Sequence, residues 1–79
     1  MNVLLFAMAK DLVGCDRVSI AGPAATSVGE LRRQLKQQYP SLARLAEVSA
    51  FAVNDEFADD LTHIPVGAEV ALLPPVSGG

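Results

Sequence analysis

The stretch Val3-Leu4-Leu5-Phe6-Ala7-Met8 is an unbroken apolar run close to the start of the sequence. Such a run is typical of a strand that is buried on both faces, because a strand with one wet face alternates apolar and polar residues. A second strongly apolar segment, Glu69-Val70-Ala71-Leu72-Leu73, is followed by Pro74-Pro75, which cannot donate hydrogen bonds to a sheet. The two most apolar strands belong at the centre of a sheet, so we predict that they lie side by side and parallel.

A helix between these strands would provide the crossover that parallel neighbours need. Ser27-Val28-Gly29-Glu30 has the spacing of a capping box, and Pro40 ends the helical pattern near Tyr39. Gly29 is unfavourable inside a helix, and tight packing is the one reason we can offer for it. The face expected to be buried consists of Val28, Leu31, Leu35 and Tyr39, and the face expected in solvent includes Arg32, Arg33, Lys36 and Gln37.

Shorter segments complete the order of elements. After a turn at residues 13–16, Arg17-Val18-Ser19-Ile20-Ala21 alternates as a strand, which we expect to pair antiparallel with the first. Residues 41–47 can form a further helical turn capped by Ser41, residues 49–53 a third strand, residues 54–56 a turn, residues 57–58 a short return strand, and residues 65–68 a last turn. A mixed sheet packed on one main helix predicts the α+β class and the β-grasp fold of ubiquitin-like proteins. Residues 1–73 would form the domain and residues 74–79 an extended tail.

The composition limits the classes of function. Of the 79 residues, 51% are hydrophobic and 19% are charged, so we expect more apolar surface than one helix and one sheet can cover, with some kept for a partner. A net charge of −3, with every Lys and Arg before Val48, argues against nucleic-acid binding. No run approaches the length of a membrane helix. The single cysteine, Cys15, excludes an internal disulfide and fits a reducing cytoplasm.

The tail Pro74-Pro75-Val76-Ser77-Gly78-Gly79 carries the chemistry that the sequence predicts. The prolines favour an extended direction away from the domain, and the glycines allow the backbone to enter a channel too narrow for other residues. The α-carboxylate of Gly79 would become reactive by attacking the α-phosphate of ATP, and a sulfur donor would then displace AMP to leave a thiocarboxylate. The alternative is an end without function, since chain termini are often poorly ordered.

Residues 66–79 resemble the closing pattern of a known family, the small subunit of molybdopterin synthase, within the wider group of sulfur-carrier proteins. That pattern is Gly-Asp-Glu-Val, an apolar pair and Pro-Pro-Val-Ser/Thr-Gly-Gly, and Ala68 stands here where an Asp is common. The first apolar run, followed by Lys10-Asp11 and Gly14, is similar to the family's first strand, basic-acidic pair and glycine, with Lys10 in place of the usual Arg. Ala52-Val53-Asn54 resembles its mid-chain strand and turn. The resemblance covers nearly the whole chain.

The resemblance implies a cycle with partner enzymes. An adenylating enzyme that uses ATP and magnesium would activate Gly79, and a sulfur-transfer system would make the thiocarboxylate. Residues 74–77 would thread into the large synthase subunit, Gly78 would give access, and sulfur would pass to cyclic pyranopterin monophosphate to form the molybdopterin dithiolene. Catalytic side chains would belong to the large subunit, and this chain would be a non-catalytic carrier subunit of a transferase complex, binding no cofactor or metal. The complex would be a heterotetramer.

Aromatic residues are the candidate partner contacts outside the tail, since aromatic side chains often carry interface energy. We predict Phe6 and Phe57 as partner-binding residues and consider Phe51 as a third. Core packing is the alternative for each of them, and it is the favoured one for Phe6 and Phe51.

Polar residues outside the tail have simpler explanations. His63 has no neighbouring histidine or cysteine, so we expect it in a loop and not at a metal. Asp59-Asp60 is expected to be solvated, and Cys15 is expected to be an incidental thiol, not a sulfur relay. Lys10 and Asp11 are either charges that contact a partner or a pair that is simply exposed to solvent.

Two other functions stay open at this point. A sulfur carrier for thiamine thiazole or tRNA thiolation would share the fold and the Gly-Gly end, although Pro-Pro-Val-Ser argues against it. A ubiquitin-like adaptor would bind partners through its sheet without activation of its terminus.

Overall fold

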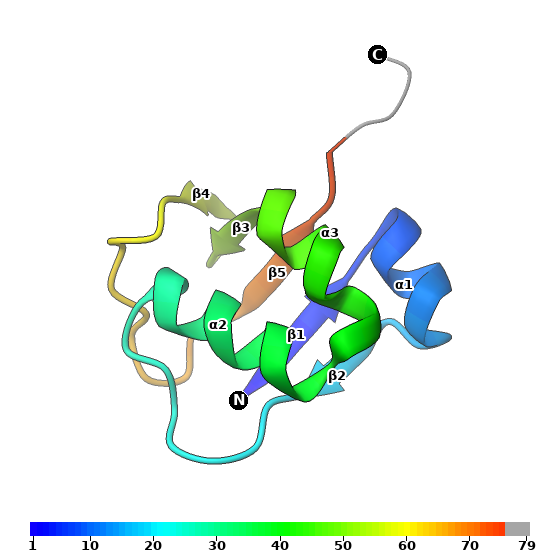
Figure 1. Ribbon diagram of the computed structural model, residues 1–79. Coiled ribbons are helices and arrows are strands. Elements are labelled where there is room, and N and C mark those ends of the chain that lie inside the picture. Colours follow the sequence, from blue (N-terminus) through cyan, green and yellow to red (C-terminus); the bar gives the residue numbers. More distant parts are fainter. Residues whose placement is uncertain (76–79) are drawn as a thin grey trace.

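The computed structural model describes residues 1–75, and Figure 1 shows its helices lying across a twisted sheet. The elements are, in order, β1 (Asn2–Leu5), α1 (Ala7–Val13), β2 (Arg17–Ser19), α2 (Val28–Gln38), η1 (a 3-10 turn, Pro40–Leu42), α3 (Ala43–Val48), β3 (Ala50–Val53), β4 (Glu56–Ala58) and β5 (Val70–Leu73).

The strands form one mixed sheet in the order β2-β1-β5-β3-β4. β1 and β5 lie side by side and parallel, with Val3 opposite Val70, which confirms the prediction for the two most apolar segments. β2 pairs antiparallel with β1, and β3 pairs antiparallel with both β4 and β5. Asn54 and Asp55 make the turn between β3 and β4 with positive φ angles of 50° and 68°. This conformation matches the right-handed twist of a tight hairpin.

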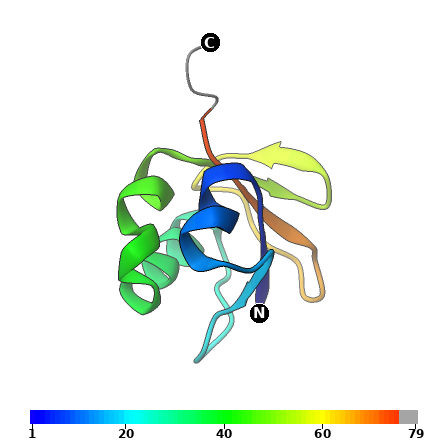
Figure 2. The same cartoon turned by 90° about the vertical axis from the view of Figure 1, so that its right-hand side faces the viewer.

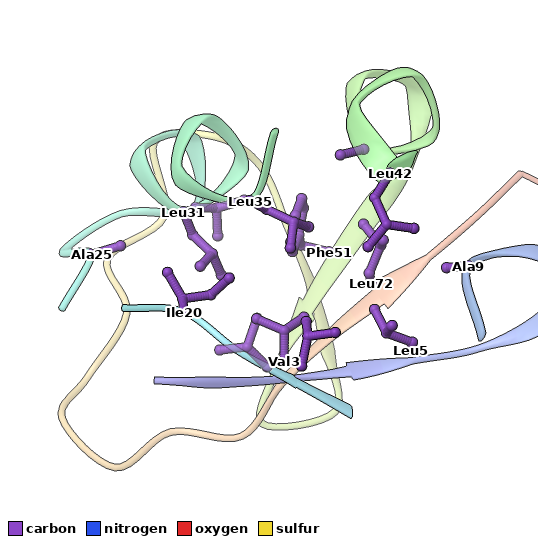
Figure 3. Close-up of a cluster of buried hydrophobic side chains, with 14 of the residues drawn as sticks. Val3, Leu5, Ala9, Ile20, Ala25, Leu31, Leu35, Leu42, Phe51 and Leu72 are labelled. Atoms are coloured by element: carbon purple, nitrogen blue, oxygen red, sulfur yellow. The ribbon is translucent and has the colours of Figure 1, made fainter. Parts of the chain in front are cut away.

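The core lies between the sheet and the helices. Figure 2 shows α2 and α3 on one side of the strands. Figure 3 shows apolar side chains from both layers meeting there, including Leu31 and Leu35 of α2 above Val3 of β1. Phe51 of β3 is fully buried among them, so core packing is its role. The largest fully buried side chains are Phe51, Leu5, Leu31, Leu35, Leu42, Leu72, Val3, Val28 and Val70.

The prediction that residues 3–8 form one strand buried on both faces is wrong. β1 ends at Leu5, and the helix α1 begins at Ala7 and ends before Gly14. Gly14 adopts a left-handed φ of 82°, and its N–H donates to the carbonyl oxygen of Lys10 at 2.8 Å, which closes the helix. The error has a physical cause, since a short apolar run does not distinguish a strand from a helix that buries one face. Ala9 provides that buried contact in α1.

The helix α2 begins as its sequence predicts. Ser27 precedes it in extended conformation, and its Oγ accepts a hydrogen bond from the N–H of Glu30 at 3.3 Å. The Glu30 carboxylate reaches back one residue further than a capping box requires, to the N–H and hydroxyl of Thr26. Tight packing does explain Gly29, because a Cβ there would lie 3.1 Å from the carbonyl oxygen of Asp60.

The segment after α2 differs in detail from its prediction. A helical turn is present, but it begins at Pro40, and Leu42, not Ser41, precedes α3 without a side-chain cap. Proline favours the first position of a helical turn. The turn therefore starts before Ser41 and places that residue inside it.

We expected Arg32 on the solvent-facing side of α2 and Asp60 in solvent. Instead, the two side chains bind each other, and Arg32 is mostly buried. The Arg32 guanidinium donates to the Asp60 carboxylate at 2.8 Å and to the carbonyl oxygen of Ser49 at 2.8 Å. It also lies 4.9 Å from the ring centroid of Phe51. Its side chain is only 17% exposed, so Arg32 ties α2 to the end of α3 and to the loop before β5.

A second ion pair links α2 and α3 at the surface. Lys36 of α2 donates to the carboxylate of Glu47 in α3. This hydrogen bond and the charge of Lys36 lower the pKa of Glu47 below its usual value. Arg33, one residue after Arg32, is exposed as predicted.

Candidate partner-binding face and tail

One row of paired residues crosses the whole sheet on the side away from the helices. Directly paired residues point to the same face of a sheet. The neighbouring row contains Val3 and Val70, whose side chains are buried in the core, so this row points the other way. From edge to edge it consists of Arg17, Leu4, Ala71, Ala52 and Phe57.

This surface, here called the open face, carries no helix within residues 1–75. Helices α1, α2 and α3 each contribute buried residues to the core cluster on the other side. Leu4 and Ala71 are only half-buried although they lie on central strands. A contiguous row of apolar side chains on an uncovered sheet face is typical of a surface that another molecule covers.

A shallow hollow of about 220 Å³ lies on the open face. Both predicted aromatic contacts line it: Phe57 is 81% exposed and Phe6 is 47% exposed, so the core-packing alternative is wrong for these two residues. The hollow is lined by Leu4, Phe6, Ala52, Asp55, Phe57, Glu69, Ala71 and Leu73.

The tail begins at one end of this hollow. β5 ends at Leu73, Pro74 is half-buried and Pro75 is exposed, and Figure 1 shows this segment leaving the end of β5 away from the sheet and helices. Leu5 is opposite Leu72, so Phe6, which follows β1, and Leu73, the last residue of β5, both lie at the end of the hollow from which the tail leaves. The predicted site residues Val76, Ser77, Gly78 and Gly79 lie outside the described residues.

The remaining candidate residues are apart from the hollow. Cys15 is exposed, and its thiol donates to the carbonyl oxygen of Arg17 at 3.3 Å. His63 lies in a loop, as predicted, where it forms an isolated bridge with Ser27. Lys10 and Asp11 are both exposed. Within residues 1–75, no cluster of three or more His, Cys, Asp or Glu side chains is placed to hold a metal ion.

Sequence reasoning missed Leu4, Ala52, Ala71 and Leu73 as members of the open face. The signal was present, because β1 and β5 are apolar at both alternating positions although helices cover only one side.

None of the helices in the described part of the chain has the length and apolarity needed to span a bilayer.

A family model described as the ThiS family matches residues 3–79, which is nearly the whole chain. The chain belongs to the ThiS family. Among relatives of this ThiS-family protein, the molybdopterin synthase sulfur carrier subunit of Dictyostelium discoideum is 40% identical, over 99% of this chain and 94% of the relative. The same subunit from Caenorhabditis briggsae is 37% identical over 100% and 96%, and that from Homo sapiens 30% identical over 100% and 93%. The resemblance to the small subunits of molybdopterin synthase is therefore confirmed.

Solved structures confirm the ubiquitin-like β-grasp fold of this ThiS-family chain. SAMP1 from Haloferax volcanii matches with a TM-score of 0.79 at 28% identity, covering 99% of this chain and 97% of that one. A complex of subunits 1 and 2 of the molybdopterin-converting factor from Helicobacter pylori contains a chain that matches with a TM-score of 0.67 at 32% identity, covering 99% and 96%.

Proposed function

We propose that this chain is the sulfur-carrier subunit of a molybdopterin synthase and that the α-carboxylate of Gly79 is its reactive group. The observation that carries the proposal is the full-length family match, which extends through Gly79. The position of the tail supports it, because β5, the central strand, leads directly into residues 74 and 75 beside an apolar face.

The proposed chemistry begins with activation of the carboxylate. A carboxylate oxygen of Gly79 attacks the α-phosphate of ATP, pyrophosphate leaves, and an acyl-adenylate forms. A sulfur nucleophile at the oxidation level of sulfide then attacks the acyl carbon, and AMP departs with its electron pair to leave the thiocarboxylate. ATP and magnesium belong to the adenylating enzyme in this scheme, and this chain itself binds no cofactor.

Sulfur donation returns the carrier to its starting state. The thiocarboxylate sulfur passes to cyclic pyranopterin monophosphate, and water restores the oxygen of the Gly79 carboxylate. A dithiolene holds two sulfur atoms, so each molybdopterin requires two deliveries. The carrier contributes no catalytic side chain to these steps, which the large subunit would catalyse. The single exposed Cys15 is in keeping with a reducing, cytoplasmic location for this cycle.

The open face is the proposed docking surface for the large subunit. The Helicobacter pylori relative was solved as a complex of two subunits. In the present chain, Phe6 and Phe57 expose large apolar side chains beside the tail, where a partner that receives the tail would also cover them. Residues 74–77 would then extend from this interface into the partner's active site, and Gly78 would allow close approach.

Intact mass spectrometry tests the activation step. The protein is incubated with an adenylating enzyme, ATP, magnesium and a sulfur donor, and we expect its mass to rise by the difference between sulfur and oxygen. A protein whose terminal residue is removed provides the matched control and should not gain this mass. An unchanged mass for the intact protein would favour an adaptor that works without terminal activation.

A second assay assigns the pathway. The thiocarboxylated protein is mixed with a large synthase subunit and cyclic pyranopterin monophosphate, and we expect molybdopterin to form. Failure here, together with sulfur transfer in thiazole formation or tRNA thiolation, would refute the assignment to molybdopterin while keeping the carrier chemistry.

A further inference from the structure

A larger cavity of about 460 Å³ lies at the end of the sheet opposite the tail. It is enclosed by the first residues of β1, the segment before α2 and the loop that leads into β5. Its lining is mostly apolar and includes Leu4, Ala24, Ile64 and Val66. This volume is in the range of pockets that bury small ligands, so a large apolar side chain can enter it.

The cavity is continuous with the proposed docking surface. Leu4 and Glu69 line both this cavity and the smaller hollow beside the tail. Leu4 belongs to the row that crosses the open face, and Arg17 is its direct partner in β2. A molecule that covers the hollow and extends along β1 would therefore reach the cavity without leaving the sheet.

The charges at the mouth of the cavity define what it can recognise. Arg17 is exposed and has no ion-pair partner within residues 1–75, where the ion pairs are Arg32 with Asp60 and Lys36 with Glu47. Glu69, also unpaired in this part of the chain, lines the same cavity. Arg17 lies on the edge strand β2 and Glu69 directly before the central strand β5, with β1 between them. An apolar group whose neighbouring carboxylate is on the β2 side can therefore pair with the guanidinium away from Glu69.

We propose that this cavity is a second anchor pocket for the large subunit, which inserts an apolar side chain there and places a neighbouring carboxylate on Arg17. The inference rests on the proposed function, because it identifies the same partner. Contacts at both ends of the open face would fix the rotation of the carrier on its partner. The tail would then point in a single direction, since β1 and β5 connect the cavity to the tail as parallel neighbours.

Affinity measurements with two cavity variants test the proposal. Arg17→Glu reverses the charge at the mouth, and Ala24→Phe fills the cavity from an exposed position. We expect each to raise the dissociation constant for the large subunit by about tenfold or more in isothermal titration calorimetry. The matched controls are Arg44→Glu, an exposed arginine on α3, and Ala21→Phe, an exposed alanine outside the cavity lining, and both should stay within about twofold of the wild type.

Hydrogen exchange of the wild-type complex gives a readout that needs no variant. Val66 and Gly67 lie at the cavity, and we expect their amide protons to exchange more slowly when the large subunit is bound. Wild-type affinity for both cavity variants, or unchanged exchange at these amides, would overturn the anchor pocket and leave the proposed function intact. Absence of any binding between the wild-type carrier and the large subunit would overturn both.

Discussion

Replacing Phe57 by alanine should separate docking from folding. The side chain is 81% exposed, so its removal should change the free energy of unfolding by no more than about 0.5 kcal/mol. A Phe buries roughly 150–250 Å² when it is covered, and about four-fifths of that area is available to a partner here. At about 25 cal/mol per Å², covering it contributes about 3–5 kcal/mol, of which alanine retains a part. We therefore expect a loss of about 2–3 kcal/mol in binding, or about 30- to 150-fold in the dissociation constant.

The assay is calorimetric titration of each variant into the large subunit, with thermal unfolding followed by circular dichroism. Leu61→Ala is the matched control, because Leu61 is 92% exposed but lies in the loop after β4 and not in the hollow. An unchanged dissociation constant for Phe57→Ala would refute docking through the open face. An equal loss for Leu61→Ala would show that exposure alone, and not position on the sheet, explains the effect.

Three further predictions concern the fold and the tail. Arg32→Gln should lower the free energy of unfolding in urea by about 2–4 kcal/mol, because it removes charged hydrogen bonds to the partly buried carbonyl oxygens of Ala46 and Ser49, whereas Arg33→Gln should change it by less than about 0.5 kcal/mol. Gly29→Ala should lower the melting temperature despite the better helix propensity of alanine, because the new Cβ would lie 3.1 Å from the carbonyl oxygen of Asp60; a higher melting temperature would contradict this contact. Deletion of Gly79 should abolish the mass gain on activation and leave the melting temperature unchanged, and a marked fall in that temperature would contradict a tail that lies outside the core.

The parts of the fold that sequence predicts well are those in which one local pattern dominates. The helix α2 has a capping serine, helical spacing and a terminating proline, and all three agree with its observed bounds. The parallel pairing of β1 and β5 followed from their apolarity alone. By contrast, the start of α1 was missed because its first two residues, Ala7 and Met8, also end the apolar run that predicted a strand. The role of Arg32 depended on carbonyl groups that only the tertiary fold brings together.

The candidate site likewise has parts that local sequence patterns predict and parts that they do not. The tail and Phe57 could be proposed from the sequence, because a terminal Gly-Gly after two prolines and an aromatic residue beside a turn are local features. The cavity could not, since its lining joins Arg17 and Ala24 to Ile64, which lies 40 residues after Ala24 in the sequence. Neither the register of β1 with β2 nor the path of the loop before β5 can be derived from those segments one at a time.

The position of β5 has a mechanical consequence. This strand is hydrogen-bonded on both sides, to β1 in parallel and to β3 antiparallel, and the tail continues from its end. A force applied along the tail therefore acts in shear on the hydrogen bonds of β5 to both β1 and β3. A strand that is paired on both sides separates only when the rest of the sheet also opens. In the proposed cycle, the carrier would therefore be withdrawn from its partner with the sheet intact and ready for the next round of loading.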